Sequence, residues 1–304
     1  MSKDWESSFA FWAKSPSQTE HERCERVIRA INKAIADSPH LQGRRIMVFT
    51  QGSFRNRVNV RQDSDVDVGV MLYEYFLPEY PAGKTAADFG NHDVDYTFAQ
   101  FKNELEQALV SHFGRQAVTR GNKAFDIKAS ASQVEADAVP LFEFRHYWDN
   151  GEYRAGVALK PDSGGMTTNY PERLVSYWPT TPLHYENGNA KNDRTSRRYR
   201  GMVRILKKVR IEMESARDPA AGIPGYLIEC LVWNAPDDCF GANTWRERVR
   251  AALAFLWNHT KDDTTCEKWC EVDAIKYLFH SSQPWTRNQA HAFIEAAWYF
   301  VGAR

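Results

Sequence analysis

The stretch "FTQGSFRNRVNVRQDSDVDVGVML", residues 49–72, decides the fold expected for this chain. A turn at Gly52-Ser53 leads into a polar loop, and the strand that follows alternates valines with Asp65 and Asp67. Successive side chains of a strand point to opposite faces, so the valines share one face and the two carboxylates share the other. A solvated edge strand is the alternative, but the apolar "GVML" that follows favours an internal strand. Because neighbouring carboxylates repel each other and favour a cation, the pattern predicts a metal site.

A third carboxylate is expected from a neighbouring strand. Residues 123–129 and 133–144 predict two antiparallel strands, and in the second of these Asp137 alternates with Ala136 and Ala138. Mg²⁺ prefers oxygen ligands and usually takes one or two carboxylates together with substrate phosphates. Two such ions, about 3.5–4 Å apart, can activate an attacking hydroxyl and neutralise a leaving pyrophosphate. The three carboxylates therefore predict metal-dependent phosphoryl transfer.

The composition restricts the partners and the location. The 304 residues contain 39 basic and 39 acidic side chains, whereas proteins that wrap long nucleic acid usually carry a basic excess. A small anionic ligand met by a local basic cluster is compatible with this balance. The chain has no apolar run long enough for a transmembrane helix, and "MSKDWESSFAFW" does not fit a secretory signal. We therefore expect a cytoplasmic protein with no membrane partner and no long nucleic-acid partner.

The five cysteines do not indicate a disulfide framework, because their number is odd. Cys266 and Cys270 are four residues apart and would share one face of a helix, with His259 and His280 flanking them. A zinc site is one interpretation. The spacing differs from the usual pair separated by two residues, so it favours ordinary buried thiols.

Strands early in the chain and helices late predict an α+β fold. The first part, residues 1–165, would be a catalytic core with a long helix within residues 15–40 and a second helix at 97–113. Residues 161–172 and 177–192 are rich in Pro, Gly, Asn and Thr and predict connecting loops. The second part, residues 166–304, would be mainly helical. Its helices are expected at 193–216, 225–234, 244–259, 268–280 and 286–300.

The segment "TQGSFRNRVNVRQDSDVDVGV" resembles the polymerase-β-type nucleotidyltransferases, and more narrowly the bacterial cGAS/DncV-like nucleotidyltransferases (CD-NTases). The stretches "EADAVPLFEFR", "HYENGNAKN", "RRYRGMVRILKKVR" and "IPGYLIECLVWNAP" resemble further segments of that family. The matches run from about residue 45 to 236. The resemblance implies a polymerase-β-like core with a mixed sheet and flanking helices, joined to a helical C-terminal lobe, with the active site in the cleft of a bilobal enzyme.

The resemblance also implies roles for individual residues. Asp65, Asp67 and Asp137 would be catalytic and bind two Mg²⁺ ions, for which Mn²⁺ can substitute. The remaining residues would bind the donor nucleotide: Gln51, Gly52, Ser53 and Lys207 its triphosphate, and Gly225 and Tyr226 the nucleotide itself.

Two residues compete for reading the base. Family members that recognise a pyrimidine carry an asparagine just before a Tyr/Trp-Pro pair, shortly ahead of a His-Tyr-x-Asn-Gly element. Asn169 precedes Tyr-Pro here, but His184 lies well beyond it. Tyr177, followed by Trp-Pro, stands closer to that element. Both residues are therefore candidates, and an ordinary loop asparagine is the alternative for Asn169.

The helix around Lys207 is expected to be amphipathic. Met202, Leu206, Val209 and Met213 recur at helical spacing, and the basic residues Arg200, Arg204, Lys207, Lys208 and Arg210 take the rest of its surface. A solvated face is the alternative interpretation of the basic set. Lysine suits phosphate oxygens as a compact positive charge.

The resemblance implies an enzyme that condenses ribonucleoside triphosphates, such as ATP with UTP or another triphosphate, into a cyclic oligonucleotide with release of pyrophosphate. The favoured product is a cyclic dinucleotide from the pyrimidine-using branch, acting as a second messenger of antiphage defence on a separate effector. One alternative is nucleotide transfer to a tRNA end or a protein hydroxyl, and the zero net charge weighs against tRNA. Another is a catalytically inactive nucleotide-binding regulator, against which the complete set of carboxylates argues.

Overall fold

The structure is a computed structural model that describes residues 3–61, 66–92, 94–130, 134–169 and 183–303. The chain divides into two compact units. The sheet unit comprises residues 18–54 and 65–182, and the helical unit comprises residues 1–17, 55–64 and 183–304. The boundary expected near residue 165 thus lies at 182/183 in the structure. The first residues belong to the helical unit because Phe9 of α1 (Trp5–Trp12) is buried in its core.

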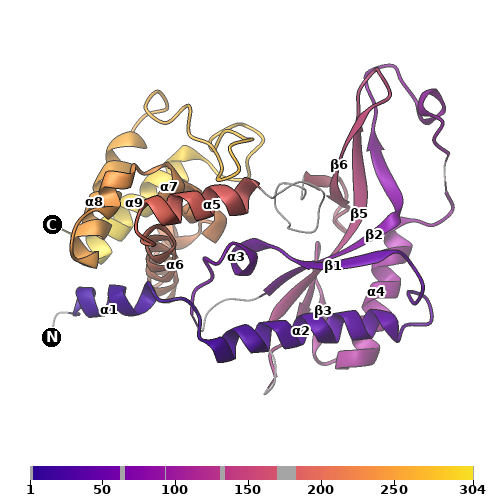
Figure 1. The fold of residues 1–304 in the computed structure, drawn as a ribbon, viewed down its shortest axis with the longest axis horizontal. Helices are drawn as coiled ribbons and strands as arrows, with labels where there is room; N and C mark the ends of the chain where they lie inside the picture. The colour runs from indigo at the N-terminus through magenta and orange to yellow at the C-terminus, as the bar shows by residue number, and fades with distance from the viewer. Residues whose placement is uncertain (1–2, 62–65, 93, 131–133, 170–182, 304) are drawn as a thin grey trace. The chain divides into compact units, whose positions relative to one another are not determined.

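The sheet unit contains a seven-stranded mixed sheet (Figure 1). Its strands are β1 (Ile46–Thr50), β2 (Val66–Glu79), β3 (Val118–Arg120), β4 (Phe125–Ile127), β5 (Ala136–Tyr147), β6 (Tyr153–Leu159) and β7 (Thr167–Asn169). The order is β1-β2-β5-β4-β3, with β6 pairing β5 and β7. β2 and β5 run parallel, and the other pairs are antiparallel. The strands expected at 44–50, 123–129 and 133–144 are confirmed.

Two helices and one face of this sheet form the core of the sheet unit. α2 (Gln18–Ala36) and α4 (Phe98–Phe113) pack with the fully buried Val66, Val68 and Val70 of β2. The alternation of valines is therefore confirmed as a core-facing pattern. On the other face, Phe49 of β1 lies opposite Gly69, where an added Cβ would come within 2.4 Å of the Phe49 ring. The sheet unit also contains the short α3 (Gly52–Arg55), whose last residue belongs to the helical unit, and the 3₁₀ turn η1 (Ala86–Phe89).

The helical unit is built around α6 (Tyr199–Ser215), whose apolar side chains are buried among those of α7 (Gly225–Asn234), α8 (Trp245–His259) and α9 (Arg287–Phe300). α5 (Leu183–Arg194) and the 3₁₀ turns η3 (Pro219–Ala221) and η4 (Asp237–Phe240) complete it. The helices expected at 225–234, 244–259 and 286–300 are confirmed.

Two expectations for the helical unit are wrong. Residues 183–192 were expected in a loop but belong to α5, and a left-handed backbone at Ser196 and Arg197 separates α5 from α6. Residues 268–280 form turns and an isolated bridge between Cys270 and Tyr277, with left-handed Ala274 between them. Cys266 and Cys270 therefore share no helix face. Among the described residues, no group of three or more His, Cys, Asp or Glu side chains is suited to hold a metal.

Candidate active site

Two of the three expected metal-binding carboxylates lie side by side in the sheet unit. Asp67 of β2 is the register partner of Asp137 on the parallel strand β5. Neighbouring strands are about 4.8 Å apart, and register partners project to the same face. Both aspartates are half-buried, whereas Val66, Val68, Ala136 and Ala138 on either side of them are fully buried on the opposite face. The pair offers oxygen ligands of the kind that Mg²⁺ prefers. Asp65 lies outside the described residues.

A third carboxylate continues this row. Asp126 of β4 is the antiparallel register partner of Asp137, so Asp67, Asp137 and Asp126 occupy equivalent positions on three adjacent strands. Asp126 is exposed, and its neighbours Phe125 and Ile127 are fully buried. Asp126 was not among the carboxylates expected from the sequence. The alternation of Phe125 and Ile127 around it, in a strand expected to pair with that of Asp137, was the signal that could have found it.

The Gly-Ser turn contacts Asp67 in two ways, through a backbone hydrogen bond and through the close approach of Gly52 to its carboxylate. The Gln51 N–H donates to the carbonyl of Asp67 at 2.9 Å. Gly52 begins α3 with φ +61°, and an added Cβ there would lie 2.0 Å from Oδ2 of Asp67. Only glycine fits this position, both for its backbone conformation and for its space. The structure thus brings Gln51, Gly52, Asp67 and Asp137 together, with Ser53 next in α3.

The nucleotide-binding residues expected late in the chain form a second group, within the helical unit. An added Cβ at Gly225, the first residue of α7, would lie 3.5 Å from Cε of Lys207, so the two residues are in contact. Nζ of Lys207 lies 3.6 Å from Oε2 of Glu229, one helical turn after Gly225. Both ionic groups are almost fully buried, with Lys207 7% and Glu229 2% exposed. The alternative of a solvated face is therefore wrong for Lys207, and also for Arg204, which is buried and donates to the carbonyl of Ala13 at 2.9 Å.

Glu229 links Lys207 to a buried histidine. Nε2 of His184 donates to Oε1 of Glu229 at 2.8 Å, and Nδ2 of Asn56 lies 2.8 Å from the same ring nitrogen. Burial opposes ionisation of Glu229, but the charges of His184 and Lys207 hold its pKa below the ordinary value. The carboxylate therefore stays charged and fixes the lysine beside the start of α7. Helix N-termini and lysines both favour anions, which suits a phosphate-binding role.

Tyr226 is held by the same surroundings. Its ring stacks on His184 with the centroids 5.8 Å apart, and its hydroxyl donates to Oε2 of Glu271 at 3.1 Å. Glu271 also accepts a hydrogen bond from Gln283 at 2.7 Å. Burial raises the pKa of Tyr226, so the phenol remains a neutral donor. Lys207, Gly225 and Tyr226 therefore form one cluster within the helical unit, and their role in binding the donor nucleotide stays a prediction.

Of the two candidates for reading the base, the structure describes Asn169 but not Tyr177. Asn169 is exposed on β7 and lies opposite Val157 of β6, which in turn lies opposite Glu143 of β5. Glu143 is six residues beyond Asp137, on the order of 20 Å along the strand. The structure therefore does not bring Asn169 to the carboxylates. Tyr177 lies outside the described residues.

Comparison with known proteins matches the chain over almost its full length. A family model described as "cGAS/DncV-like nucleotidyltransferase C-terminal helical domain" matches residues 186–302. The chain is 38% identical to a "Cyclic dipyrimidine nucleotide synthase CdnE" of Legionella pneumophila, covering 99% of each chain. It is 33% identical to a protein of the same name from Cecembia lonarensis, covering 98% of each. The chain belongs to the cGAS/DncV-like nucleotidyltransferase family.

A solved structure agrees with this assignment. The Rhodothermus marinus CdnE c-UMP-AMP synthase, determined with Apcpp and Upnpp, superposes with a TM-score of 0.76 at 28% identity, covering 96% of this chain and 94% of that one. The resemblance stated from the motifs and the expected α+β fold are thus confirmed. As a cGAS/DncV-like nucleotidyltransferase, the chain is an enzyme. The relatives do not favour the alternative of a macromolecular acceptor.

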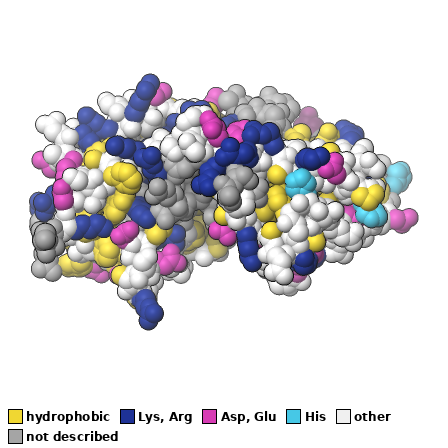
Figure 2. Space-filling model, turned by 90° about the horizontal axis from the view of Figure 1, so that it is seen from below, with side chains coloured by type: hydrophobic (Ala, Val, Ile, Leu, Met, Phe, Trp, Pro, Cys, Tyr) yellow, Lys and Arg dark blue, Asp and Glu magenta, His cyan; other side chains and the backbone are white. Residues whose placement is uncertain are grey.

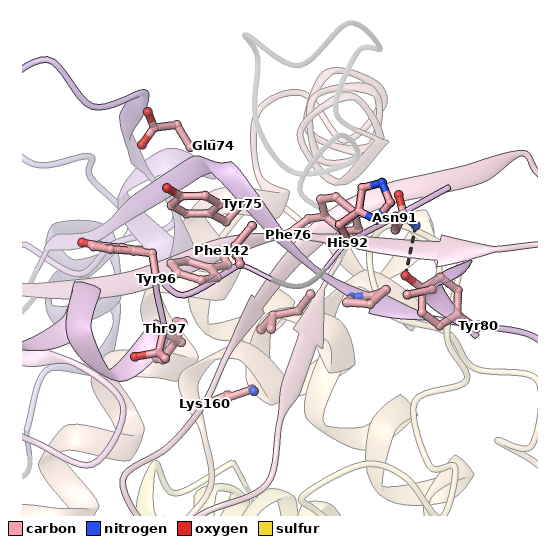
Figure 3. Close-up of a pocket in the computed structure, with 15 residues that line it drawn as sticks. Glu74, Tyr75, Phe76, Tyr80, Asn91, His92, Tyr96, Thr97, Phe142 and Lys160 are labelled. Carbon is pink, nitrogen blue, oxygen red and sulfur yellow. Dashed lines mark hydrogen bonds between the residues drawn. The ribbon is translucent and has the colours of Figure 1, made fainter. Parts of the chain in front are cut away.

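A separate cavity of about 400 Å³ lies elsewhere on the sheet unit of this nucleotidyltransferase (Figure 3). The β2–β5 register shifts between Leu72 and Phe76, and the residues after the shift line the cavity with Tyr96 and Phe142. The Tyr75 and Tyr96 rings stack with their centroids 5.3 Å apart. Of the residues singled out in the sequence, those that the structure describes do not line this cavity.

Two further features concern the charges on the surface and the apolar character of the helices. Basic and acidic side chains are interspersed over the face shown in Figure 2. No helix within the described residues has both the length and the apolar character that a membrane span requires.

Proposed function

We propose that this nucleotidyltransferase condenses two ribonucleoside triphosphates into a cyclic dinucleotide that contains at least one pyrimidine, with uracil as the first candidate. The observation that carries the proposal is the near-complete match to two relatives named cyclic dipyrimidine nucleotide synthases, at 38% and 33% identity. The relatives named for purine or mixed products, a cyclic dipurine synthase and a cyclic UMP-AMP synthase among them, are 28–32% identical. We expect the enzyme to act in the cytoplasm and its product to bind a separate effector in antiphage defence.

Asp65, Asp67 and Asp137 would hold the metal ions. When bound, Mg²⁺ or Mn²⁺ neutralises charge on the phosphates and favours deprotonation of the attacking hydroxyl. The backbone N–H groups of Gly52 and Ser53, with the side chain of Gln51, would hold the donor triphosphate. A glycine there leaves room for the phosphate to approach the backbone.

The helical unit would supply the remaining contacts to the donor. Lys207, fixed by Glu229, would neutralise triphosphate oxygens beside the N-terminus of α7 at Gly225. Tyr226, fixed through its hydroxyl and its stacking on His184, would contact the donor nucleotide. These groups position the donor and do not react with it.

The reaction balances as two successive transfers. An acceptor ribose hydroxyl bonds to the α-phosphorus of the donor, the bond from that phosphorus to the β-phosphate oxygen breaks, and pyrophosphate leaves. The hydroxyl proton passes to the carboxylate of Asp137. A second transfer within the linear intermediate closes the ring, so two triphosphates yield one cyclic dinucleotide and two pyrophosphates.

The first experiment is product analysis with all four ribonucleoside triphosphates, each α-³²P-labelled in turn, in Mg²⁺ or Mn²⁺. A phosphatase-resistant small molecule, identified by mass spectrometry and absent with Asp67→Asn, is expected. The matched control is Asp37→Asn, which alters an exposed carboxylate just after α2 and should leave product formation unchanged. Label on protein or tRNA would overturn the proposal in favour of a macromolecular acceptor. Nucleotide binding without any product would favour the inactive regulator.

The base reader is tested with the same products. If Asn169 reads the pyrimidine, Asn169→Ala should shift the product toward purines and leave total pyrophosphate release within about tenfold. If Tyr177 does so, Tyr177→Ala should cause the shift and Asn169→Ala should not.

A further inference from the structure

Three arginines surround one aromatic ring in the helical unit. The guanidinium carbons of Arg55, Arg57 and Arg200 lie 4.7, 5.7 and 5.8 Å from the centroid of the Tyr185 ring. Arg55 and Arg57 come from the segment that precedes β2, Arg200 from the first turn of α6, and Tyr185 from α5. Side chains from three separate segments thus converge on one point, which we call the arginine cluster.

Among the described residues, no carboxylate pairs directly with the arginine cluster. Within the described part of the chain, none of its three guanidinium groups forms an ion pair with an Asp or Glu side chain. Within the same described residues, their side-chain hydrogen bond runs from Nη2 of Arg200 to Oδ1 of Asn189 at 2.7 Å, and that acceptor is neutral. The Nε atoms of Arg55 and Arg200 are buried and have no acceptor in the part of the chain that the structure describes. Unsatisfied buried donors are costly, so the Nε atoms of Arg55 and Arg200 favour an anion, and the exposed Arg57 adds a third positive charge beside them.

The arginine cluster is also held in place before any anion arrives. Arg57 has a left-handed backbone with φ 59°, and the buried Arg204 donates to its carbonyl at 2.9 Å. Burial lowers the pKa of Arg200, and the nearby charge of Arg57 lowers it further. Stacking on Tyr185 offsets only part of such a cost. Backbone strain and like-charge proximity of this kind gather at ligand sites.

We propose that Arg55, Arg57 and Arg200, with Tyr185 and Asn189, bind the triphosphate of the acceptor nucleotide. The inference rests on the proposed function, because joining two triphosphates leaves the triphosphate of the acceptor intact during the first transfer. Guanidinium groups match phosphate oxygens in charge and geometry. Lys207, proposed for the donor, follows Arg200 by seven residues on α6, which is two turns or about 10 Å along one helix face. One helix would then offer a cation to each of the two triphosphates.

The decisive assay separates acceptor from donor. The acceptor is supplied as an α,β-methylene triphosphate, which can receive but cannot donate, or as the corresponding nucleoside monophosphate. The donor is an ordinary triphosphate at saturation. For Arg57→Gln and Arg200→Gln, we expect the KM of the triphosphate acceptor to rise about tenfold or more, while the KM values of the monophosphate acceptor and of the donor stay unchanged. Arg250→Gln, an exposed arginine of α8, is the matched control and should change none of them.

A rise in donor KM, an equal loss for both acceptors, or no change in either would overturn the inference. A second arm needs no product, so it distinguishes failure of this inference from failure of the proposed function. Inorganic tripolyphosphate at low salt should raise the melting temperature of the Asp67→Asn protein, and adding Arg57→Gln and Arg200→Gln should remove at least half of that rise. Without ligand, Arg200→Gln should melt no lower than the parent protein, because it relieves unbalanced charge. An unchanged response to tripolyphosphate would also refute the site.

Discussion

The two units of this nucleotidyltransferase hold their candidate site residues by different means. In the sheet unit, backbone pairing between β2 and β5 places Asp67 beside Asp137, and Gly52 fits against Asp67 because it has no side chain. In the helical unit, Lys207 and Tyr226 are placed by other side chains, namely Glu229, His184 and Glu271. A substitution in the sheet unit should therefore act locally, whereas one in the helical network should affect several residues at once.

The largest effect is expected from Asp67→Asn. Pyrophosphate release should fall about 10³-fold or more, because a metal-binding carboxylate supports several kcal/mol of transition-state stabilisation. The free energy of unfolding should change by less than about 1 kcal/mol, because the β2–β5 backbone ladder and not this side chain positions the strand. Asp126→Asn, from the same row of carboxylates, is the control and should lose less than about tenfold. A large loss of stability in Asp67→Asn would mean that this side chain, and not backbone pairing alone, holds the strand.

Gly52→Ala should have the next largest effect. The new Cβ would displace the carboxylate of Asp67, so we expect activity to fall about 10²-fold and the protein to lose about 1–2 kcal/mol of stability. Gly43→Ala is a matched control, since Gly43 has φ +79° with no atom within 4 Å of an added Cβ. It should show a similar loss of stability and normal pyrophosphate release. Equal activity losses in the two variants would mean that backbone strain, not the contact with Asp67, matters.

Glu229→Gln tests the helical network. It leaves buried Lys207 without this counter-charge, so we expect a loss of about 3 kcal/mol in denaturant unfolding and a donor KM about tenfold higher. Because the pKa of Glu229 is lowered in the folded protein, its contribution is complete above the ordinary value of 4.5 and is lost as the pH falls below it. The variant should therefore lose less stability on acidification than the parent. Glu214→Gln, an exposed partner of Arg210, should change stability by less than about 0.5 kcal/mol.

The smallest effect is expected from a half-exposed ion-pair group of the sheet unit. Asp162 accepts hydrogen bonds from Arg120 at 2.9 and 3.0 Å and lies 3.0 Å from Nζ of Lys102, and these groups lower its pKa to about 2. Its contribution is present above its ordinary pKa of 3.8 and disappears as the pH falls toward 2. Asp162→Asn should cost about 1 kcal/mol or less at neutral pH, and 0.5 M salt should reduce that cost. A salt-insensitive loss as large as that of Glu229→Gln would contradict the contrast between the units.

The same contrast explains what the sequence could predict. Alternation of Val66, Val68 and Val70 with aspartates is a local pattern, so the strand, its buried face and the role of Asp137 as a neighbour followed from a few residues. The burial of Lys207 did not follow, because Glu229 and His184 lie 22 and 23 residues away and only the tertiary fold brings them to it. α5 was missed because it is rich in Asn and contains Gly, which have low helix propensity. Packing in the folded protein outweighs that propensity.

α1 belongs to the helical unit although it is synthesised first, so it must wait for its partners during translation. Phe9 packs in a core with Tyr199 and with residues of α6 and α8, and Glu6 accepts hydrogen bonds from the first N–H groups of α8 at Trp245 and Arg246. These partners leave the ribosome about 190–240 residues later, which at about 5–20 residues per second is roughly 10–50 s. During that time the sheet unit can already form, while the aromatic face of α1 has no partner. On ribosome-stalled chains, we therefore expect α1 to remain open to protease or to chaperones until α8 has emerged.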